Sequence, residues 1–452
     1  MTVTEVRDPA TEAVIERVPA ADVAAADAAV ERAAAAFEGW RAVAPADRAR
    51  LLRRLADRLD AEREALARLE MRNTGKPIGD ARAEMGMVAE TFAYYAGAPE
   101  RLLGDTIPVA GGVDLTFREP LGVVGLIVPW NFPLVIASWK LAPALAAGNT
   151  VVLKPAELTP LTALAFARLA AEAGIPPGVV NVLPGPGRMV GQRLVEHERV
   201  AKIAFTGSTE VGRSIMRGAA GTVKRVTLEL GGKSANVVFA DADLPAAAAA
   251  APAAVFGNAG QDCCARSRIL VERPALDEFL ALLEPAVRGL RVGDPAEEST
   301  EMGPLISAGQ REQVASFVPE GTPVAIRGSV PDGPGWWYPP TVLTSVAPGD
   351  RAATEEIFGP VAVVLPFVGE AEAVRLANAT IYGLSGSVWT RDAARALRVA
   401  RAIDTGTLSV NSNTSVRVAT PFGGFKQSGV GRELGPHALD HYTELKNVFI
   451  AT

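Results

Sequence analysis

GVVGLIVPWNFPLVIASWKLAPALAAGNTVVLKPAE, the stretch at residues 122–157, decides the fold class of this chain. Its two short runs, GVVGLIV and TVVLKP, are mostly apolar and rich in valine, as expected of strands that are buried on both faces. The run between them, through Trp139 to Ala147, is long enough for a helix. A strand, a helix and a second strand in this order predict a unit of a parallel sheet.

The same strand-then-helix order repeats along the chain. After TVVLKP, VVNVLP and VAKIAFTG, helices are expected at Thr159–Ala173, from near Met189, and at Thr209–Ala219. The pattern restarts near Leu230. Further strands are expected at Ser234–Val238, Arg268–Val271, Val361–Pro366 and Thr407–Val410, and further helices at Leu276–Leu290 and Ala371–Ala377. The prediction is an α/β protein with a Rossmann-type parallel-sheet domain and a second α/β domain.

The outer segments are predicted to form helices and a hairpin. Asp22–Phe37 and Asp47–Leu69 have the spacing of amphipathic helices. Thr106–Arg118 alternates apolar and polar residues around two glycines, which predicts a β-hairpin, and a short strand is expected at Lys446–Ile450. The alanine-rich stretch at residues 241–257 is expected to be a helix interrupted by Pro252.

Composition excludes several classes of protein. The 452 residues predict two or three domains, and a net charge of −6 without a basic run disfavours nucleic acid as a partner. Glycines and prolines break the uncharged stretch Leu121–Trp139, so it is not expected to span a membrane. The only cysteines, Cys263 and Cys264, are neighbours and cannot form a disulfide framework. With no signal-peptide pattern in MTVTEVRDPATEA, a cytoplasmic location is expected.

Cys263 is the first candidate catalytic residue. It follows GNAGQD at residues 257–262, a glycine-bearing turn that could open a helix. The amides of a helix N-terminus would lower the pKa of the thiol and could hold an oxyanion. The alternative is a small apolar core residue, and the residues alone leave both interpretations open. His197, His437 and His441 lack the spacing of a zinc site, so no metal is expected.

Glu229 and Asn131 are the second and third candidates. Glu229 lies between two leucines before a glycine pair, where burial would raise its pKa toward that of a general base. The alternative for Glu229 is a structural salt bridge with Lys233 or Lys224. Asn131 lies between two prolines that would hold its amide rigidly as an oxyanion donor, unless it only caps a turn.

Two loops could bind a dinucleotide, although the chain has no GxGxxG motif. The near miss GPGRMVG at residues 185–191 has the wrong spacing. FTGSTEVG at residues 205–212 ends a strand and opens a helix, so its amides could meet a pyrophosphate. Lys154 and Glu157 follow the second strand. A carboxylate there would hold ribose hydroxyls and repel a 2′-phosphate, which favours NAD over NADP.

Read together, these segments resemble the aldehyde dehydrogenase superfamily over nearly the whole chain. Seven motifs stand in the family's order: PWNFP at 129–133, KPAE at 154–157, FTGSTEVG at 205–212, LELGGKS at 228–234, GQDCC at 260–264, EEIFGPV at 355–361 and PFGGFKQSG at 421–429. The separation of Glu229 from Cys263 is also similar to the family's spacing and selects Cys263 over Cys264 as the nucleophile.

The resemblance implies a catalytic apparatus. Cys263 would attack the aldehyde carbon, and Asn131 with the Cys263 amide would hold the oxyanion. Glu229 would activate water to hydrolyse the thioester, and Lys140 would tune the proton path. The cofactor-binding residues would be Pro129, Trp130, Lys154, Glu157, Gly187, Gly207, Ser208, Leu230, Glu356 and Phe358.

The resemblance also implies a domain plan. An NAD-binding domain is expected at residues 1–101 and 121–229, a catalytic domain at 230–430, and an oligomerisation element at 102–120 and 431–452. A homodimer or homotetramer would follow.

The aldehyde itself is less well indicated. Trp139, Asp262 and Phe422 are the expected substrate residues. Asp262 would favour a cationic aminoaldehyde, as in the betaine-aldehyde and aminobutyraldehyde branch, whereas Arg417 pointing inward would favour an acidic one. The loop at residues 410–417 lacks the aromatic residues that many relatives place there. Two alternatives remain: a coenzyme A-acylating semialdehyde dehydrogenase, which Glu229 disfavours, and a binding protein without turnover on the same fold.

Overall fold

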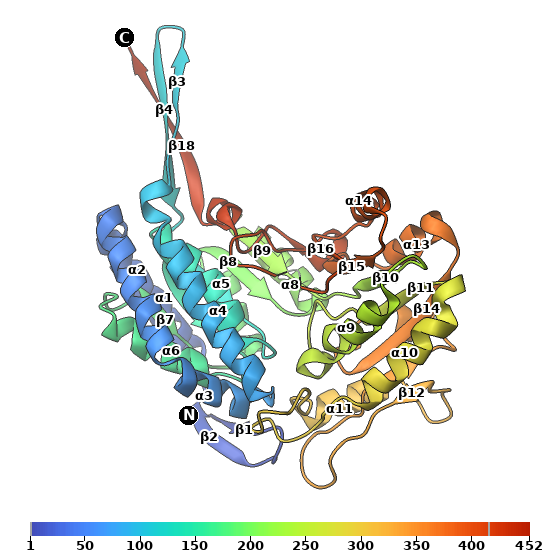
Figure 1. Cartoon of the computed structure of the whole chain (residues 1–452). Helices are drawn as coiled ribbons and strands as arrows, with labels where there is room; N and C mark the ends of the chain where they lie inside the picture. Colours follow the sequence, from blue (N-terminus) through green and yellow to red (C-terminus); the bar gives the residue numbers. More distant parts are fainter. Residues whose placement is uncertain (1, 415) are drawn as a thin grey trace.

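The first sheet of the structure contains the two strands predicted within residues 122–157. The structure is a computed structural model that describes residues 2–414 and 416–452 (Figure 1). Six strands lie in the order β17-β9-β8-β5-β6-β7, all parallel except the short β17. They are β5 (Val123–Ile127), β6 (Thr150–Lys154), β7 (Val180–Val182), β8 (Val200–Thr206), β9 (Arg225–Glu229) and β17 (Gly429–Val430).

Helices cover both faces of this sheet, as predicted. In β5, Val124 and Leu126 belong to the core that includes α4 and α5, whereas Val123 and Ile127 belong to the core beneath α1 and α8. This alternation follows from the two-residue period of a strand. The helices are α1 (Val23–Arg41), α2 (Pro45–Ala61), α3 (Arg63–Thr74), α4 (Ile78–Ala96), α5 (Pro133–Ala146), α6 (Leu161–Glu172), α7 (Gln192–Glu196) and α8 (Thr209–Ala220).

A second, seven-stranded sheet forms the other α/β half. Its order is β12-β13-β14-β11-β10-β15-β16, and only the β12–β13 pair is antiparallel. The strands are β10 (Ala235–Val238), β11 (Arg268–Glu272), β12 (Ile326–Arg327), β13 (Thr341–Leu343), β14 (Val361–Phe367), β15 (Ser385–Trp389) and β16 (Thr407–Val410). The helices are α9 (Leu244–Phe256), α10 (Leu276–Arg288), α11 (Ala308–Ala315), α12 (Arg351–Thr354), α13 (Gly369–Asn378) and α14 (Ala393–Ala402). The predicted α/β class is confirmed.

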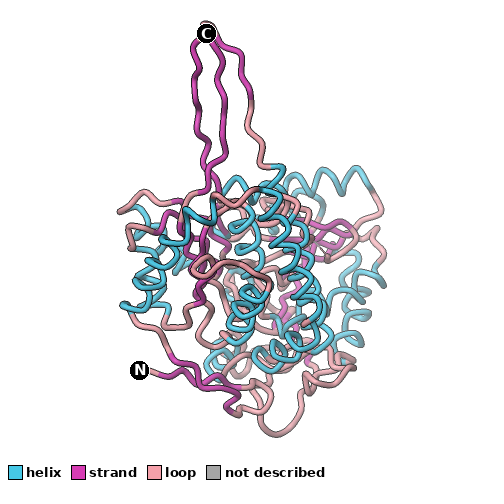
Figure 2. The backbone as a smooth tube through the Cα atoms, turned by 90° about the vertical axis from the view of Figure 1, so that its left-hand side faces the viewer, coloured by secondary structure: helices cyan, strands magenta, loops and turns pink. Residues whose placement is uncertain are grey.

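An arm projects from the body of the molecule (Figures 1 and 2). The hairpin of β3 (Thr106–Val109) and β4 (Gly112–Pro120) pairs with β18 (Thr443–Ala451), so both predicted elements join in one antiparallel sheet. A separate hairpin near the N-terminus consists of β1 (Val3–Arg7) and β2 (Val14–Pro19). Within the described residues, no helix is long and apolar enough to cross a membrane.

Several local predictions were wrong. The expected helix at Asp47–Leu69 is two helices, because α2 ends at Ala61 and α3 begins at Arg63. The helix near Met189 begins as a π-helical turn over residues 187–191. Pro252 does not interrupt α9, which continues through it. The strand β15 has the sequence SGSVW, whose glycine and serines hide its burial from a hydrophobicity pattern.

Candidate active site

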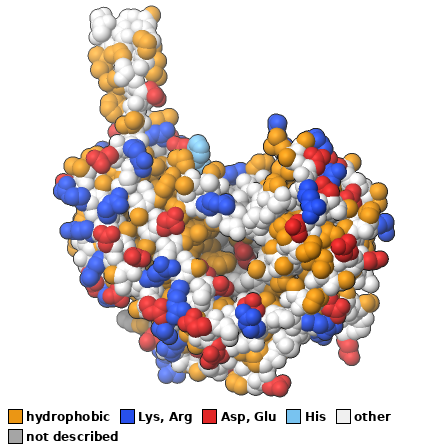
Figure 3. Space-filling view, viewed as in Figure 1, with side chains coloured by type: hydrophobic (Ala, Val, Ile, Leu, Met, Phe, Trp, Pro, Cys, Tyr) orange, Lys and Arg blue, Asp and Glu red, His pale blue; other side chains and the backbone are white. Residues whose placement is uncertain are grey.

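A crevice lies where strands of the first sheet end. The space-filling view shows the surface hollowed between the two α/β halves (Figure 3). The loops after β5, β8 and β9 form one wall, and residues from the second half form the other. The lining side chains and backbone belong to Pro129, Trp130, Asn131, Thr206, Gly207, Ser208, Leu230, Gly231, Cys263, Gln310, Gln313, Glu356 and Phe358. Strand ends of this kind are where α/β proteins bind ligands.

A second cavity of about 340 Å³ lies on the other side of Cys263. It is more apolar, and α4, α5 and the loop after β16 provide much of its wall. Its lining residues are Glu84, Met87, Phe132, Val135, Ile136, Trp139, Thr206, Glu229, Asp262, Cys263, Cys264, Arg266, Asn413, Thr414, Val416 and Phe422. Cys263 and Thr206 line both spaces, so the thiol lies where the crevice and the cavity meet.

Cys263 does not open a helix, and that prediction was wrong. A 3₁₀ turn at Gly257–Gly260 precedes it, a short irregular stretch follows, and β11 begins only at Arg268. The turn contains Asn258 and Ala259 in left-handed conformations, with φ of 50° and 55°. Cys263 is therefore not the first residue of a helix whose N-terminus could lower the pKa of its thiol.

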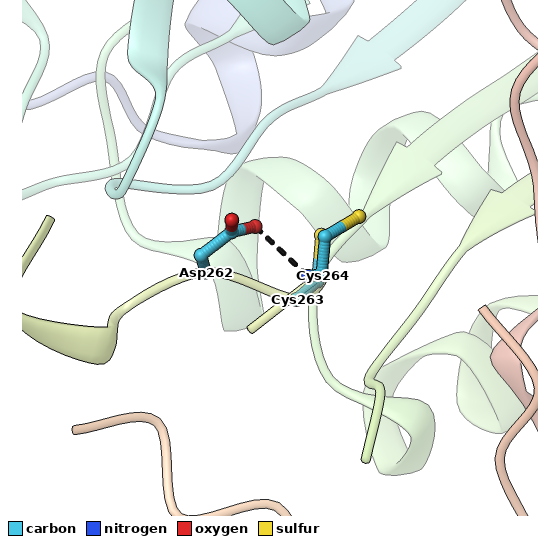
Figure 4. A group of neighbouring side chains, drawn as sticks. All are labelled: Asp262, Cys263 and Cys264. Carbon is cyan, nitrogen blue, oxygen red and sulfur yellow. Dashed lines mark hydrogen bonds between the residues drawn. The ribbon is translucent and has the colours of Figure 1, made fainter. Parts of the chain in front are cut away.

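Local contacts instead hold the thiol neutral. A hydrogen bond with the Cys264 thiol, together with burial, raises the pKa of Cys263 well above its usual range. The Cys264 backbone N–H donates to Asp262 Oδ1 at 2.8 Å (Figure 4). The Asp262 carboxylate and the Cys263 and Cys264 thiols offer atoms that lie within 4.8 Å of one another. The spacing of His and Cys residues in the sequence did not indicate this cluster. Cys263 must therefore lose its proton before or during attack on a carbonyl.

Glu229 ends β9 and faces the apolar cavity. Its side chain is buried, and Oε2 has no hydrogen-bond partner among the described residues. Burial and the nearby Glu433 carboxylate raise its pKa well above the usual range. A side chain at Gly423 would place its Cβ 2.8 Å from Glu229 Oε1, so the glycine leaves room for the carboxyl group. The described residues give Glu229 no salt bridge to Lys233 or Lys224.

Lys140 lies behind Glu229 rather than in the cavity wall. Its buried ammonium forms an ion pair with Glu433, which sits in a two-residue bridge with Phe422. Lys140 counteracts and Glu433 reinforces the rise in the Glu229 pKa. Glu433 is a residue that the sequence motifs did not indicate.

Asn131 follows β5 and is buried. Its Nδ2 donates to the Gln261 carbonyl at 2.9 Å, which joins the PWNFP loop to the turn before Cys263. Its own carbonyl accepts from Lys76 Nζ at 3.0 Å and from Asn258 Nδ2 at 3.1 Å. The Asn131 side chain is therefore bonded to the segment just before Cys263, and both residues line the crevice.

The predicted cofactor residues divide into two groups. Pro129, Trp130, Gly207, Ser208, Leu230, Glu356 and Phe358 line the crevice. Lys154, Glu157 and Gly187 lie outside that lining. The loop after β6 and the loop after β7 are joined there, because Glu157 accepts from the Gly187 amide at 3.2 Å. The Lys154 amine donates to the Pro155 carbonyl, and burial lowers its pKa to about 8.

The crevice has features that fit a dinucleotide. Glu356 accepts from the Gly232 amide at 2.8 Å, and a Cβ on Gly231 would lie 2.5 Å from its other oxygen. Trp130 and Phe358 pack edge to face at 5.2 Å between centroids. Thr206 Oγ1 is buried without a partner among the described residues. The Gly207 amide is already used by the Glu229 carbonyl, so the free amides at the start of α8 begin at Ser208.

The predicted substrate residues all line the apolar cavity. Trp139 and Phe422 pack together with centroids 5.2 Å apart. Burial raises the pKa of Asp262, which weakens it as a fixed negative charge for a cationic substrate. Among the described residues, Val416 lines the cavity and Arg417 does not, which removes the argument for an acidic aldehyde. Ser415, in the same loop, lies outside the described residues.

The motifs alone missed part of the cavity wall. Glu84, Met87, Val135 and Ile136 come from α4 and α5, and their helical spacing is a signal for burial but not for contact with a ligand. Gln310 and Gln313 of the crevice lie on α11, another helix that the pattern did not indicate. Helix faces were thus the main source of unpredicted site residues.

Comparisons with known proteins identify the family of this chain. The model of the aldehyde dehydrogenase family matches residues 1–448. The putative aldehyde dehydrogenase DhaS of Bacillus subtilis is 44% identical over 451 residues, covering 98% of this chain and 91% of the relative. The betaine aldehyde dehydrogenase of the same species is 44% identical over 420 residues, covering 91% and 86%.

A solved structure gives the same result in three dimensions. The NAD+ complex of the aldehyde dehydrogenase from Bacillus cereus superposes with a TM-score of 0.97 at 44% identity, covering 100% of this chain and 93% of that chain. The family match, the relatives and the paired cavities around Cys263 lead to one conclusion. The chain belongs to the aldehyde dehydrogenase family and is an enzyme that oxidises aldehydes.

Proposed function

We propose that this enzyme oxidises an aldehyde to a carboxylic acid with NAD+ through a thioester on Cys263. The observation that carries the proposal is the position of Cys263, which lines both the strand-end crevice and the apolar cavity that contains Glu229. The Bacillus cereus relative forms a complex with NAD+. When bound in the crevice, this cofactor would accept the hydride from the carbon attached to Cys263.

The chain's own residues would prepare that carbon. The Cys263 sulfur forms a bond to the aldehyde carbon as its S–H proton leaves, and the carbonyl π electrons move to oxygen. The Asn131 Nδ2 has a second hydrogen free of the Gln261 carbonyl and would donate it to this oxygen. Donors fixed in this way stabilise the transition state without having to reorganise.

Glu229 would act after oxidation. Its carboxylate takes a proton from water, the water oxygen bonds to the thioester carbon, and the Cys263 thiolate leaves. Because the pKa of Glu229 is raised, the carboxylate is a stronger base than an exposed glutamate. Lys140 and Glu433 would tune this proton transfer through their opposite effects on Glu229.

The cofactor would lie along the first sheet. Glu356 and Phe358 would hold the nicotinamide ribose and ring, and the amides from Ser208 onward the pyrophosphate. Trp130, Leu230 and Pro129 would provide the apolar walls. Lys154, Glu157 and Gly187 lie farther along, at the ends of β6 and β7, where the adenosine ribose would fall; the Glu157 carboxylate favours NAD over NADP.

Stopped-flow measurement of NADH formation tests the mechanism. Cys263→Ala should abolish NADH formation. Glu229→Gln should slow steady turnover but keep an initial burst, because the thioester forms before hydrolysis. Cys264→Ala is the matched control and should keep turnover. Full activity of Cys263→Ala would refute the nucleophile, and loss of the Glu229→Gln burst would place Glu229 before hydride transfer.

The same assay tests whether the acyl group of the thioester is transferred to coenzyme A instead of water. A coenzyme A-acylating enzyme would release the thioester to a thiol, so added coenzyme A would speed turnover of the wild type. We expect no such effect, because Glu229 faces the cavity as a base for water. A binding protein without turnover would form no NADH with any aldehyde.

The apolar wall of the cavity supports an uncharged or weakly polar aldehyde. Trp139 and Phe422 belong to it. Three carboxyl groups also line the cavity: Asp262 accepts from the Cys264 amide, Glu84 pairs with Lys76, and burial raises the pKa of Glu229 well above the usual range, which disfavours its charged form. A cationic aldehyde of the betaine type therefore remains the second candidate. An NADH screen over aliphatic, aromatic and amino aldehydes distinguishes them.

The arm supports assembly from copies of the chain. Exposed apolar side chains lie along it: Ile107, Val109, Phe117, Leu445, Val448, Phe449 and Ile450. We propose that residues 102–120 and 431–452 form the oligomerisation element of a homodimer or homotetramer, beside an NAD-binding domain (1–101 and 121–229) and a catalytic domain (230–430). Light scattering of the purified chain tests the assembly. A cytoplasmic location remains a prediction from the two reduced, adjacent thiols.

A further inference from the structure

Lys76 is a buried lysine that none of the seven motifs contains. Its side chain is 1% exposed, and it stands just before α4. The amine lies 2.5 Å from Glu84 Oε2 and 3.0 Å from the Asn131 carbonyl oxygen. It also lies 4.6 Å from the centroid of the Phe132 ring, within range of a cation–π contact. A buried charge with three such partners is held in one position.

Those contacts end on the loop that carries the oxyanion donor. The Asn131 carbonyl accepts from Lys76 and from Asn258, and Asn258 Nδ2 also donates to the Gln261 carbonyl at 3.2 Å. Asn131 Nδ2 donates to that same carbonyl. The loop after β5 and the turn before Cys263 are therefore joined through one small hydrogen-bond network, and Lys76 is its charged member.

Glu84 anchors the lysine from the other side. It lies on α4, eight residues after Lys76, and lines the apolar cavity. Burial raises the pKa of Glu84 to about 8, with Lys76 opposing the rise and Glu70 adding to it. The Lys76–Glu84 contact, with the bond from Lys76 to the Asn131 carbonyl, joins the cavity wall to the Asn131 loop.

We propose that Lys76 is a positioning residue for aldehyde attack, which fixes the Asn131 main chain so that the Asn131 amide meets the developing oxyanion. Glu84 holds Lys76 in place for this role. The inference rests on the proposed function, since it needs Cys263 as nucleophile and Asn131 as donor. A misplaced donor would slow thiohemiacetal formation while leaving the thiol and the cofactor crevice in place.

Two measurements in a Cys264→Ser background test the role. The first is the rate of the NADH burst. The second is the rate at which iodoacetamide alkylates Cys263, which is then the only thiol and which needs no oxyanion donor. We expect Lys76→Met to slow the burst about 10- to 100-fold, somewhat less than loss of the donor itself, and to change alkylation less than about twofold.

A matched variant distinguishes a positioning role of Lys76 from the effect of leaving the Glu84 charge buried without a partner. Lys76→Met leaves Glu84 without its partner, whereas Lys76→Met/Glu84→Met removes both charges. The burst of the double variant should be as slow as that of Lys76→Met. If the double variant recovers the parent burst, Lys76 only neutralises Glu84 and the proposal fails. The double variant also serves where Lys76→Met alone does not fold.

A double-mutant cycle with Asn131→Ala completes the test. If Lys76 acts through Asn131, Lys76→Met should slow the burst of Asn131→Ala by less than about twofold. A full multiplicative loss in that background would overturn the proposal. The parent's own burst reports separately on the proposed function: if the parent lacks a burst that depends on Cys263, the thioester mechanism fails before Lys76 is tested.

Discussion

The crevice and the cavity on either side of Cys263 are built differently. On the crevice side, main-chain groups fix the walls: the Gly207 amide bonds the Glu229 carbonyl, and the Gly232 amide bonds Glu356. On the cavity side, side chains of α4, α5 and the loop after β16 form most of the wall. The first space depends on strand ends and glycines, and the second depends on which side chains the helices carry.

This difference explains what each side can specify. A wall made of backbone needs particular residues, such as glycines, at particular positions, so it leaves a recognisable motif. A wall made of helix side chains accepts many residues of suitable size, so its shape can change without any loss of fold. Under the proposed function, the crevice would fix the reaction class and the cavity would determine which aldehyde is accepted.

The largest of these expected effects comes from Asn131, which lines the crevice together with Cys263. Asn131→Ala removes the amide that would hold the oxyanion, and we expect kcat to fall about 100- to 1,000-fold. KM for both NAD+ and aldehyde should change much less, because the group acts on the transition state. Steady-state kinetics with each substrate varied in turn checks this. A change confined to either KM would assign Asn131 to one side only.

The next effect should be confined to the cavity. Trp139→Ala removes one member of the Trp139–Phe422 pair, so an apolar aldehyde loses buried contact area. We expect KM for a long-chain aldehyde to rise about 10-fold or more, since each 1.4 kcal/mol is a factor of ten. KM for NAD+ should stay the same. An equal rise in KM for the aldehyde and KM for NAD+ would contradict the assignment of Trp139 to the aldehyde cavity alone.

The fold was largely predictable, and the exceptions have local causes. Short, mostly apolar runs located β5, β6 and β8, since a parallel strand covered on both faces must be largely apolar. β15 was missed because close neighbours favour its glycine and serines over large apolar residues. The break between α2 and α3 at Glu62 has no proline or glycine that would signal it.

The candidate site was predictable where a motif coincides with a strand end. Glu229 ends β9, and Asn131 and Ser208 lie in the loops after β5 and β8, so the topology brings them to one edge of the sheet. Cys263 was identified by its motif, but its surroundings were misread, because left-handed residues at 258 and 259 turn the chain away from a helix. Lys76, Glu84 and Glu433 could not be assigned, since the contacts that link them to the site, Lys76 with Asn131 and Glu433 with Lys140, join residues distant in sequence.

A smaller effect should appear in the pH profile of thioester hydrolysis. The pKa of Glu229 is raised by burial and by Glu433, and only the carboxylate form can accept a proton from water. Hydrolysis should therefore slow as the pH falls through that raised pKa. Glu433→Gln removes the neighbouring negative charge, which lowers the Glu229 pKa and should move the acid limb about one pH unit lower.

The control for this profile is Glu229→Gln, which should lose the acid limb altogether. Single-turnover decay of the thioester at a series of pH values makes the measurement without interference from cofactor binding. A shift of the limb to higher pH in Glu433→Gln would show that Glu433 acts on Glu229 through Lys140 rather than by direct repulsion.

The smallest effect is expected at the far end of the crevice side. Glu157 is exposed, so water competes for its hydrogen bonds and screens its charge. The wild type should use NAD+ with a higher kcat/KM than NADP+. Glu157→Gln should reduce that ratio about three- to tenfold, the value of one ordinary hydrogen bond exposed to water. Aldehyde KM should not move, because Glu157 contacts the Gly187 loop and not the cavity. Equal use of both cofactors by the wild type would contradict the assignment of Glu157 to the ribose. A change in aldehyde KM would instead mean that the crevice and the cavity are coupled through Cys263. The crevice and the cavity could then not be treated as two independent binding spaces.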